Sequence, residues 1–159
     1  MLSPDPLPLS LFRPPIVLVV ESRTSARTSI CRLLRALGYD GRMARDGAQA
    51  LRMLRQHPTL YQLVLTNTVL PDMDGGHLAR LVASAWPDTR VMLIAEYAPT
   101  GAMATVLAAH PDLPVLDKPF GFRELYEAVC RLVGPPRAAV PLMGKTGPRA
   151  RRRTRISVP

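Results

Sequence analysis

The chain of 159 residues is poor in aromatic side chains, cysteines and long apolar runs. Only 5% of it is aromatic although 47% is hydrophobic, so the core must consist mainly of aliphatic side chains. Two cysteines, Cys31 and Cys130, are too few for a disulfide framework or a cysteine metal cluster. No apolar run approaches the roughly 20 residues that cross a bilayer, so we expect no membrane span. Together these absences favour a protein of the reducing cytoplasm.

Acidic residues are missing from the end of the chain. The formal charge is +9, and most of it lies after Gly134. We therefore predict that residues 135–159 form a disordered basic tail. Such a tail has three candidate partners, which are nucleic-acid phosphates, an anionic surface and an acidic protein, or it serves solubility alone. The arginines concerned are Arg149, Arg151, Arg152, Arg153 and Arg155.

The N-terminal residues 1–15 are apolar but rich in proline, and no basic residue stands near their start. This composition is a poor match to a signal peptide, and we predict a flexible lead. Between lead and tail, residues 16–134 are expected to fold as one domain.

In that domain, short aliphatic runs alternate with segments of helical period. The runs predict strands buried on both faces of a parallel sheet, and the helical segments predict crossover helices. The fold class is therefore α/β, a doubly wound five-stranded parallel sheet. The expected strands are 16–20, 41–44, 63–66, 91–95 and 114–116.

Local signals mark several ends of the expected helices. Gly38 is a C-terminal cap candidate for the first helix, and Asp46 immediately precedes the second. The apolar stripes assigned to the third and last helices include Leu81 and Phe122, respectively.

Polar residues follow the strands at their carboxyl ends, where open α/β sheets keep their functional groups. Glu21 and Ser22 follow the first strand, Asn67 ends the third, and Lys118 follows the fifth. An amide at Asn67 is a poor nucleophile and carries no charge for a metal ion. We expect these side chains to form one small polar pocket.

Four segments carry a resemblance to a known family: IVLVVES, RDGAQALRML, LVLTNTVLPDMDGGHL and LDKPFGFREL. Together they resemble the receiver domain of bacterial two-component response regulators over residues 16–133. The resemblance implies a flavodoxin-like (βα)5 fold and a place in phosphorelay signal transduction.

In that family an acidic pair and an aspartate bind Mg²⁺, the aspartate accepts a phosphoryl group, and a lysine holds the phosphate. A Ser or Thr and an aromatic residue then report phosphorylation. The resemblance places the acidic pair at Glu21 and Ser22 and the acceptor at Asn67. It places the switch residues at Ile94 and Val115, and the lysine at Lys118 before Pro119.

Most of these positions have lost the chemistry of the family. Mg²⁺ prefers carboxylate oxygens, and only Glu21 and the carbonyl of Val69 would be left to bind it, so we expect weak binding or none. Lys118 is expected to pair with Glu21, with the Asn67 side-chain oxygen as a second acceptor. The interpretation is a pseudo-receiver, which is not an enzyme and which signals by phosphorylation-independent protein binding.

Other readings stay open. Asp72 and Asp74 could be alternative phosphoacceptors, although such residues more often shape a turn and cap a helix. The basic tail could make the protein a nucleic-acid-binding accessory. The expected partner is a histidine kinase, a phosphotransfer protein or a target regulator, and residues 101–133 could form a dimer contact.

Overall fold

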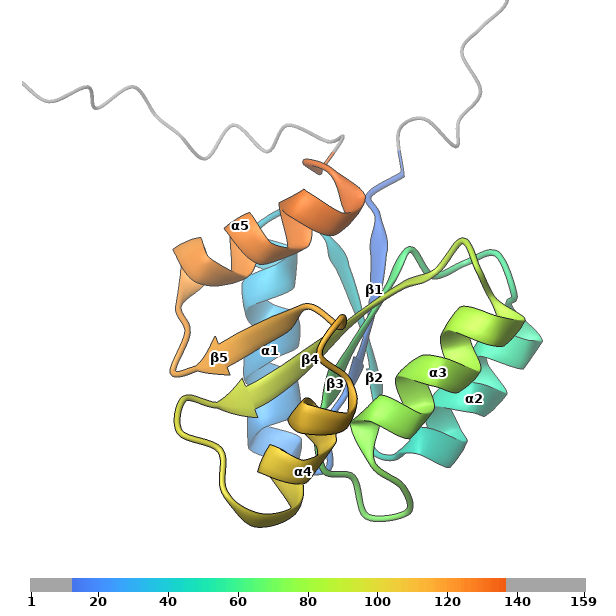
Figure 1. Ribbon diagram of the computed structural model, residues 1–159. Coiled ribbons are helices and arrows are strands. Elements are labelled where there is room, and N and C mark those ends of the chain that lie inside the picture. The colour runs from blue at the N-terminus through green and yellow to red at the C-terminus, as the bar shows by residue number, and fades with distance from the viewer. Residues whose placement is uncertain (1–12, 137–159) are drawn as a thin grey trace, which may run out of the picture.

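The computed structural model describes residues 13–136 as a sheet with helices on both faces (Figure 1). All strand pairs are parallel, in the order β2-β1-β3-β4-β5. The predicted doubly wound α/β fold is confirmed. The strands are β1 (Ile16–Val20), β2 (Asp40–Ala44), β3 (Leu63–Asn67), β4 (Arg90–Glu96) and β5 (Val115–Lys118).

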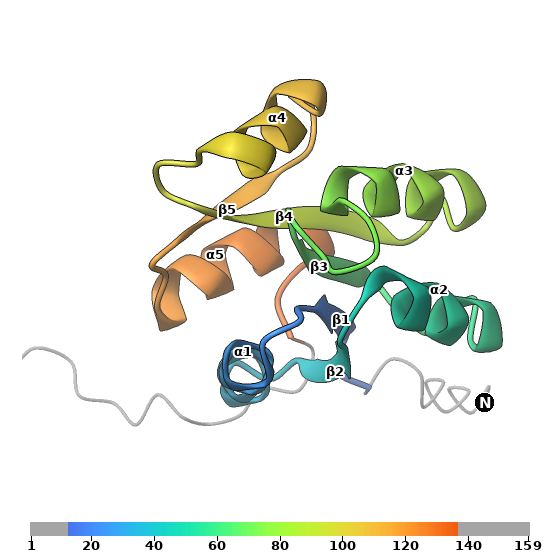
Figure 2. The ribbon, with the colours of Figure 1, turned by 90° about the horizontal axis from the view of Figure 1, so that it is seen from below.

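Five helices connect and cover the sheet. Figure 2 shows α1 and α5 on one face and α2, α3 and α4 on the other. This division follows from right-handed crossovers on either side of a central strand. The helices are α1 (Thr24–Ala36), α2 (Gly47–Gln56), α3 (Gly75–Ala85), α4 (Gly101–Ala109) and α5 (Phe122–Val133).

The aliphatic core has two layers, one on each side of the sheet. Alternate residues of a strand point to opposite faces, so Val17 and Val19 pack under α1 and α5, while Leu18 and Val20 pack under α2 and α3. All four are completely buried. Burial on both faces explains why the strands have continuous aliphatic sequences.

The predicted helix ends agree with the structure. Gly38 has a φ of 92°, and its N–H and that of Tyr39 bond the carbonyls of Arg35 and Leu34, which closes α1 with a Schellman motif. Asp46 caps α2 by accepting a hydrogen bond of 2.7 Å from the Gln49 N–H.

Three expectations about the elements differ from the structure. β5 runs to Lys118, two residues beyond the expected end. Leu81 is 37% exposed and Phe122 is 49% exposed, so the prediction that both belong to the buried stripes of their helices is wrong. Leu78 and Val82 supply the buried stripe of α3, whereas Leu125 and Val129 supply that of α5.

The predicted tail, its arginines and most of the predicted lead lie outside the described residues. Among residues 13–136, no helix is both long enough and apolar enough to cross a bilayer.

Candidate functional site

Glu21, Asn67 and Lys118 meet at the carboxyl edge of the sheet, as the strand ends predicted. β1 and β3 are neighbours, so Glu21 and Asn67 lie side by side. The Asn67 Nδ2 amide donates a hydrogen bond of 3.0 Å to Glu21 Oε2. Lys118 Nζ lies 3.6 Å from the same oxygen, which makes an ion pair across the ends of β3 and β4.

The Glu21 carboxylate is buried, with only 1% of its side chain exposed, and both of its oxygens have partners. Oε2 accepts the hydrogen bond from the Asn67 amide and forms the ion pair with Lys118. Oε1 accepts hydrogen bonds from the Arg23 N–H at 2.9 Å and the Ser22 hydroxyl at 3.4 Å. A buried charge is tolerated when it is paired and hydrogen-bonded in this way. Glu21 is therefore the centre of the site.

Asn67 uses its amide differently from the expectation. We expected its oxygen to accept from Lys118, but it is the nitrogen that bonds, to Glu21. The oxygen, Oδ1, is buried and has no hydrogen-bond partner among residues 13–136. An ionised aspartate in this place could not donate to Glu21, whereas the amide donates at any pH.

Lys118 has a second acidic partner that sequence reasoning missed. Its Nζ lies 3.7 Å from Glu96 Oε1, and Glu96 is the register partner of Lys118 in the β4–β5 pair. The signal was present in the sequence, because aligned strands place these two residues side by side at the edge. The Lys118–Pro119 peptide bond is cis.

Arg27 is another contact that the sequence did not single out. Its Nη1 donates to the backbone carbonyl of Glu21 at 2.6 Å and to that of Ser22 at 3.2 Å. These bonds tie the β1–α1 loop to the first turns of α1. Ser22 is exposed, and Val69 lies in the β3–α3 loop with its side chain 42% exposed.

The two positions assigned to the switch carry only apolar side chains. Ile94 is completely buried in the core layer under α1 and α5, and the next residue, Ala95, is also completely buried. Neither has a hydroxyl, so the end of β4 offers no side-chain donor to a phosphoryl group. Val115 lies on the edge strand β5 and is partly exposed.

Asp72 and Asp74, the alternative acceptors, cap two different helices. Asp74 accepts from the His77 N–H and caps α3, as expected. Asp72 reaches across to α2, where its two oxygens accept the N–H groups of Gly47 and Ala48 at 3.0 and 2.8 Å. Both carboxylates are therefore engaged with helix N-termini and lie in no cluster with Asn67.

Replacing Asp72 by alanine should lower the free energy of unfolding by about 1 kcal/mol at pH 7, the usual effect of losing a helix cap. Desolvation raises the Asp72 pKa, but backbone hydrogen bonds, those from Gly47 and Ala48 foremost, outweigh it and leave the pKa below its usual value. The stabilisation is thus present above the unfolded-state pKa and disappears as pH falls through the folded-state value. Urea denaturation across acidic pH measures it.

The exposed Asp112 provides the matched control. Asp112→Ala should stay within about 0.5 kcal/mol of wild type at every pH. An Asp72→Ala effect that is equally large below the folded-state pKa would contradict the capping role.

Cys31 is buried in α1, and burial raises the pKa of its thiol to about 11. A thiol with so high a pKa is a poor nucleophile, which agrees with the place of Cys31 in the core layer under α1 and α5.

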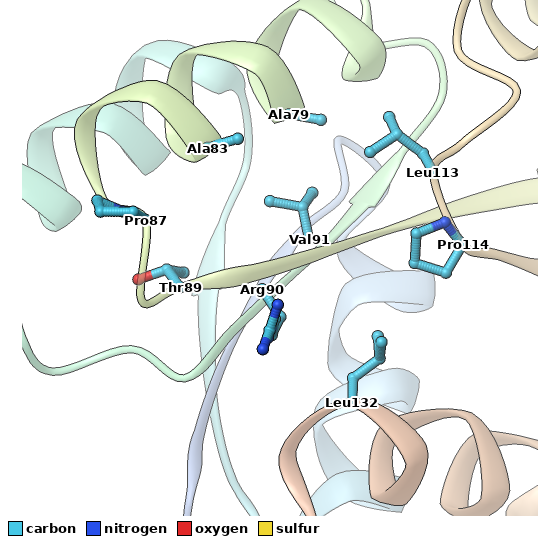
Figure 3. A pocket seen from close by; sticks show the side chains of 9 residues that line it. All are labelled: Ala79, Ala83, Pro87, Thr89, Arg90, Val91, Leu113, Pro114 and Leu132. Atoms are coloured by element: carbon cyan, nitrogen blue, oxygen red, sulfur yellow. The ribbon is translucent and has the colours of Figure 1, made fainter.

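Figure 3 shows a hollow of about 280 Å³ at the amino end of β4, lined by Val91, by Ala79 and Ala83 of α3 and by Leu132 of α5. None of its lining residues belongs to the polar site. The amino ends of the strands are the opposite edge of the sheet from the polar site. Glu21, Asn67 and Lys118 themselves form a hydrogen-bonded and ion-paired cluster.

Known proteins share this fold and are similar to this chain in sequence over most of the domain. The response regulator receiver domain family matches residues 17–130. The response regulator receiver protein CpdR of Brucella abortus is 32% identical over 121 residues, which cover 74% of this chain and 95% of CpdR. The sensor kinase CckA of the same organism is 31% identical over 113 residues, 71% of this chain but only 12% of the kinase.

Solved structures agree. The signal receiver domain of an HD domain-containing protein from Pseudomonas fluorescens Pf-5 superposes with a TM-score of 0.66 at 28% identity, over 76% of this chain and 88% of that one. The receiver domain of the hybrid histidine kinase CckA gives a TM-score of 0.61 at 25% identity, over 74% and 98%. The chain therefore belongs to the response regulator receiver domain family.

Proposed function

We propose that this receiver domain signals by binding a protein partner and takes no part in phosphoryl transfer. The observation that carries the proposal is the hydrogen bond from the Asn67 amide to Glu21. Asn67 stands where the family has its phosphoacceptor, and its amide is a poor nucleophile. The hydrogen bond to Glu21 holds the pocket together without a phosphoryl group.

The donor set also fits Mg²⁺ poorly. Magnesium requires near-octahedral oxygen ligands and usually more than one carboxylate. Glu21 is the one carboxylate at the centre of the site, and its oxygens already receive the ammonium of Lys118, two N–H groups and a hydroxyl. A metal ion would have to displace these partners, so we propose that the domain works without one.

The candidates for an alternative acceptor are weakened by their contacts. Asp72 uses both carboxylate oxygens on α2, and Asp74 holds the first turn of α3. Attack on a phosphodonor would require a free carboxylate oxygen and would release a helix cap. The apolar side chains of Ile94 and Val115 would leave no residue to sense the product.

Intact-mass spectrometry tests the proposal directly. We expect purified full-length protein, incubated with Mg²⁺ and a small phosphodonor such as acetyl phosphate, to keep its unmodified mass. A receiver domain of the same family with an aspartate at the position of Asn67, treated in the same way, is the positive control. A stoichiometric phosphoryl adduct on this chain would overturn the proposal, and Asp72→Ala and Asp74→Ala would then locate the acceptor.

The partner in this proposal is a histidine kinase, a phosphotransfer protein or a target regulator. Residues 101–133 offer one contact surface, for a partner or for a dimer. Several apolar side chains are exposed there or close by, among them Tyr97, which is 80% exposed, together with Val115 and Phe122.

A further inference from the structure

Helices α2 and α3 lie side by side on the outer face of the domain, as both views show (Figures 1 and 2). Between them is an apolar hollow of about 340 Å³. Its lining comes from Leu51 and Arg55 of α2, Leu81 and Ala85 of α3, and Trp86, which ends α3. Its volume is within the range of about 300–1,000 Å³ that is typical of ligand-binding sites.

The apolar lining is open to solvent because of how α3 is rotated. Leu78 and Val82 face the sheet, so Leu81 and Ala85 on the next side of the helix face α2 and remain accessible. Leu81 has no place in either core layer. The lining also includes Trp86 and Arg55, and tryptophan and arginine are the residue types enriched at binding hot spots.

The α2 side of the hollow is positively charged. Arg52 and Arg55 are exposed and three residues apart, on one side of the helix, and neither has a carboxylate within ion-pair distance in residues 13–136. The carboxylates near the start of these helices are already used: Asp72 caps α2 and Asp74 caps α3. Arg52 and Arg55 are therefore available for an acidic ligand.

We propose that the groove between α2 and α3 binds an acidic, amphipathic segment of a partner protein. An apolar side chain of that segment would enter the hollow beside Leu81 and Trp86, and neighbouring carboxylates would pair with Arg52 and Arg55. Guanidinium groups form bidentate pairs with carboxylates, and a buried apolar anchor beside them gives affinity.

The apolar hollow favours a protein over nucleic acid as the ligand. Binding of a phosphate backbone relies on cations and gains nothing from a space lined by leucine and alanine. A helical segment with apolar and acidic residues on one side matches both features. This inference rests on the proposed function in one respect, that the domain binds a protein partner, and it adds the surface on which the partner binds.

Trp86 is the chain's one tryptophan and lines the hollow, so it reports binding without a label. The probe is a synthetic helical peptide with leucines one turn apart and glutamates beside them, titrated into full-length protein. We expect a saturable change in Trp86 emission. Two matched peptides, one with lysines for the glutamates and one with serines for the leucines, should bind at least about tenfold more weakly.

Two double variants with the same change of charge, one at the groove and one on the opposite face, locate the surface. At the groove, Arg52→Glu with Arg55→Glu should weaken peptide binding at least about tenfold. The single variant Leu81→Ser should weaken it without a change of charge. Arg32→Glu with Arg131→Glu, on α1 and α5 of the other face, should bind as wild type. All these residues are exposed, so thermal melts should confirm that each variant is folded.

Three results would overturn the inference: no emission change with the acidic peptide, equal binding of the lysine peptide, or equal weakening by both double variants. A DNA duplex that competes as well as the peptide would show a general polyanion surface instead. Failure here would leave the phosphodonor result untouched, because intact mass reports phosphoryl transfer and does not depend on peptide binding between α2 and α3.

Discussion

Replacing Lys118 by methionine should destabilise the domain by about 2–3 kcal/mol, the effect expected when one partner of a buried ion pair is removed. Methionine keeps the length and apolar stem of lysine, so little packing is lost. Glu21 would remain buried with its charge, and its Asn67 and Arg23 hydrogen bonds would be the remaining compensation. Urea denaturation at pH 7 measures the loss.

The loss of stability in Lys118→Met comes more from leaving the Glu21 carboxylate buried without its cation than from losing the attraction between the two charges. Lys118 is 22% exposed and Glu21 only 1%, so the carboxylate has the larger desolvation penalty when the cation is gone. Glu96 is 53% exposed and can be hydrated by solvent after the change. Glu96→Gln should therefore cost less than about 1 kcal/mol, as for an exposed pair.

A double-mutant cycle separates the two contributions. Glu21→Gln removes the charge and keeps an oxygen that can accept from Asn67, so Glu21→Gln with Lys118→Met should recover most of the stability lost by Lys118→Met alone. If Lys118→Met changes stability by less than about 0.5 kcal/mol, or if the double variant is no better, the pair does not stabilise the resting pocket.

Local signals in the sequence predicted what depends on local structure. Gly38 and Asp46 were recognised because a positive φ and an N-cap are decided by nearby residues. The meeting of Glu21, Asn67 and Lys118 also followed from sequence, because parallel strands bring their carboxyl ends to one edge.

Contacts between elements were the part that sequence could not supply. Asp72 caps α2 from a loop 25 residues away from Gly47, and no local rule links the two. Leu81 and Phe122 fit an apolar helical period. Such a period identifies the apolar side of a helix, but it does not tell whether residues at the margin of that side are covered by a neighbouring helix. The orientation of the Asn67 amide likewise depends on Glu21 and not on its own segment.

Replacing Asn67 by aspartate should destabilise the domain by about 2 kcal/mol at pH 7, because it removes the donor to Glu21 and adds a like charge. A carboxylate oxygen of the new aspartate would take the place of Asn67 Nδ2, which lies 3.0 Å from Glu21 Oε2. Two carboxylates so close raise the pKa of one of them above its unfolded-state value. The destabilisation should therefore be present at neutral pH and disappear as pH falls through that raised pKa.

Mg²⁺ should reverse the same loss. The variant presents two carboxylates to a cation, so Mg²⁺ should raise its Tm and leave the Tm of wild type unchanged. Asn67→Ala is the control that removes the donor without adding charge. Its destabilisation relative to wild type should lack the recovery in acid expected of Asn67→Asp, and its Tm should not respond to Mg²⁺. A wild-type Tm that rises with Mg²⁺ as much as that of the variant would contradict the proposed loss of the metal site.

Even a variant that accepts phosphate should fail to transmit it. A phosphoryl group on the new carboxylate would lie beside Lys118, but Ile94 and Ala95 offer no hydroxyl to bind it, and Val115 has no aromatic ring to change position. A ligand shifts an equilibrium only by binding one state better than the other, and these apolar side chains supply no such difference. After treatment of Asn67→Asp with acetyl phosphate, amide chemical shifts should thus change around Glu21 and Lys118 and stay constant at Tyr97 and Val115. Shifts that spread to Tyr97 and Val115 would show that the domain keeps a switch which its side chains do not reveal.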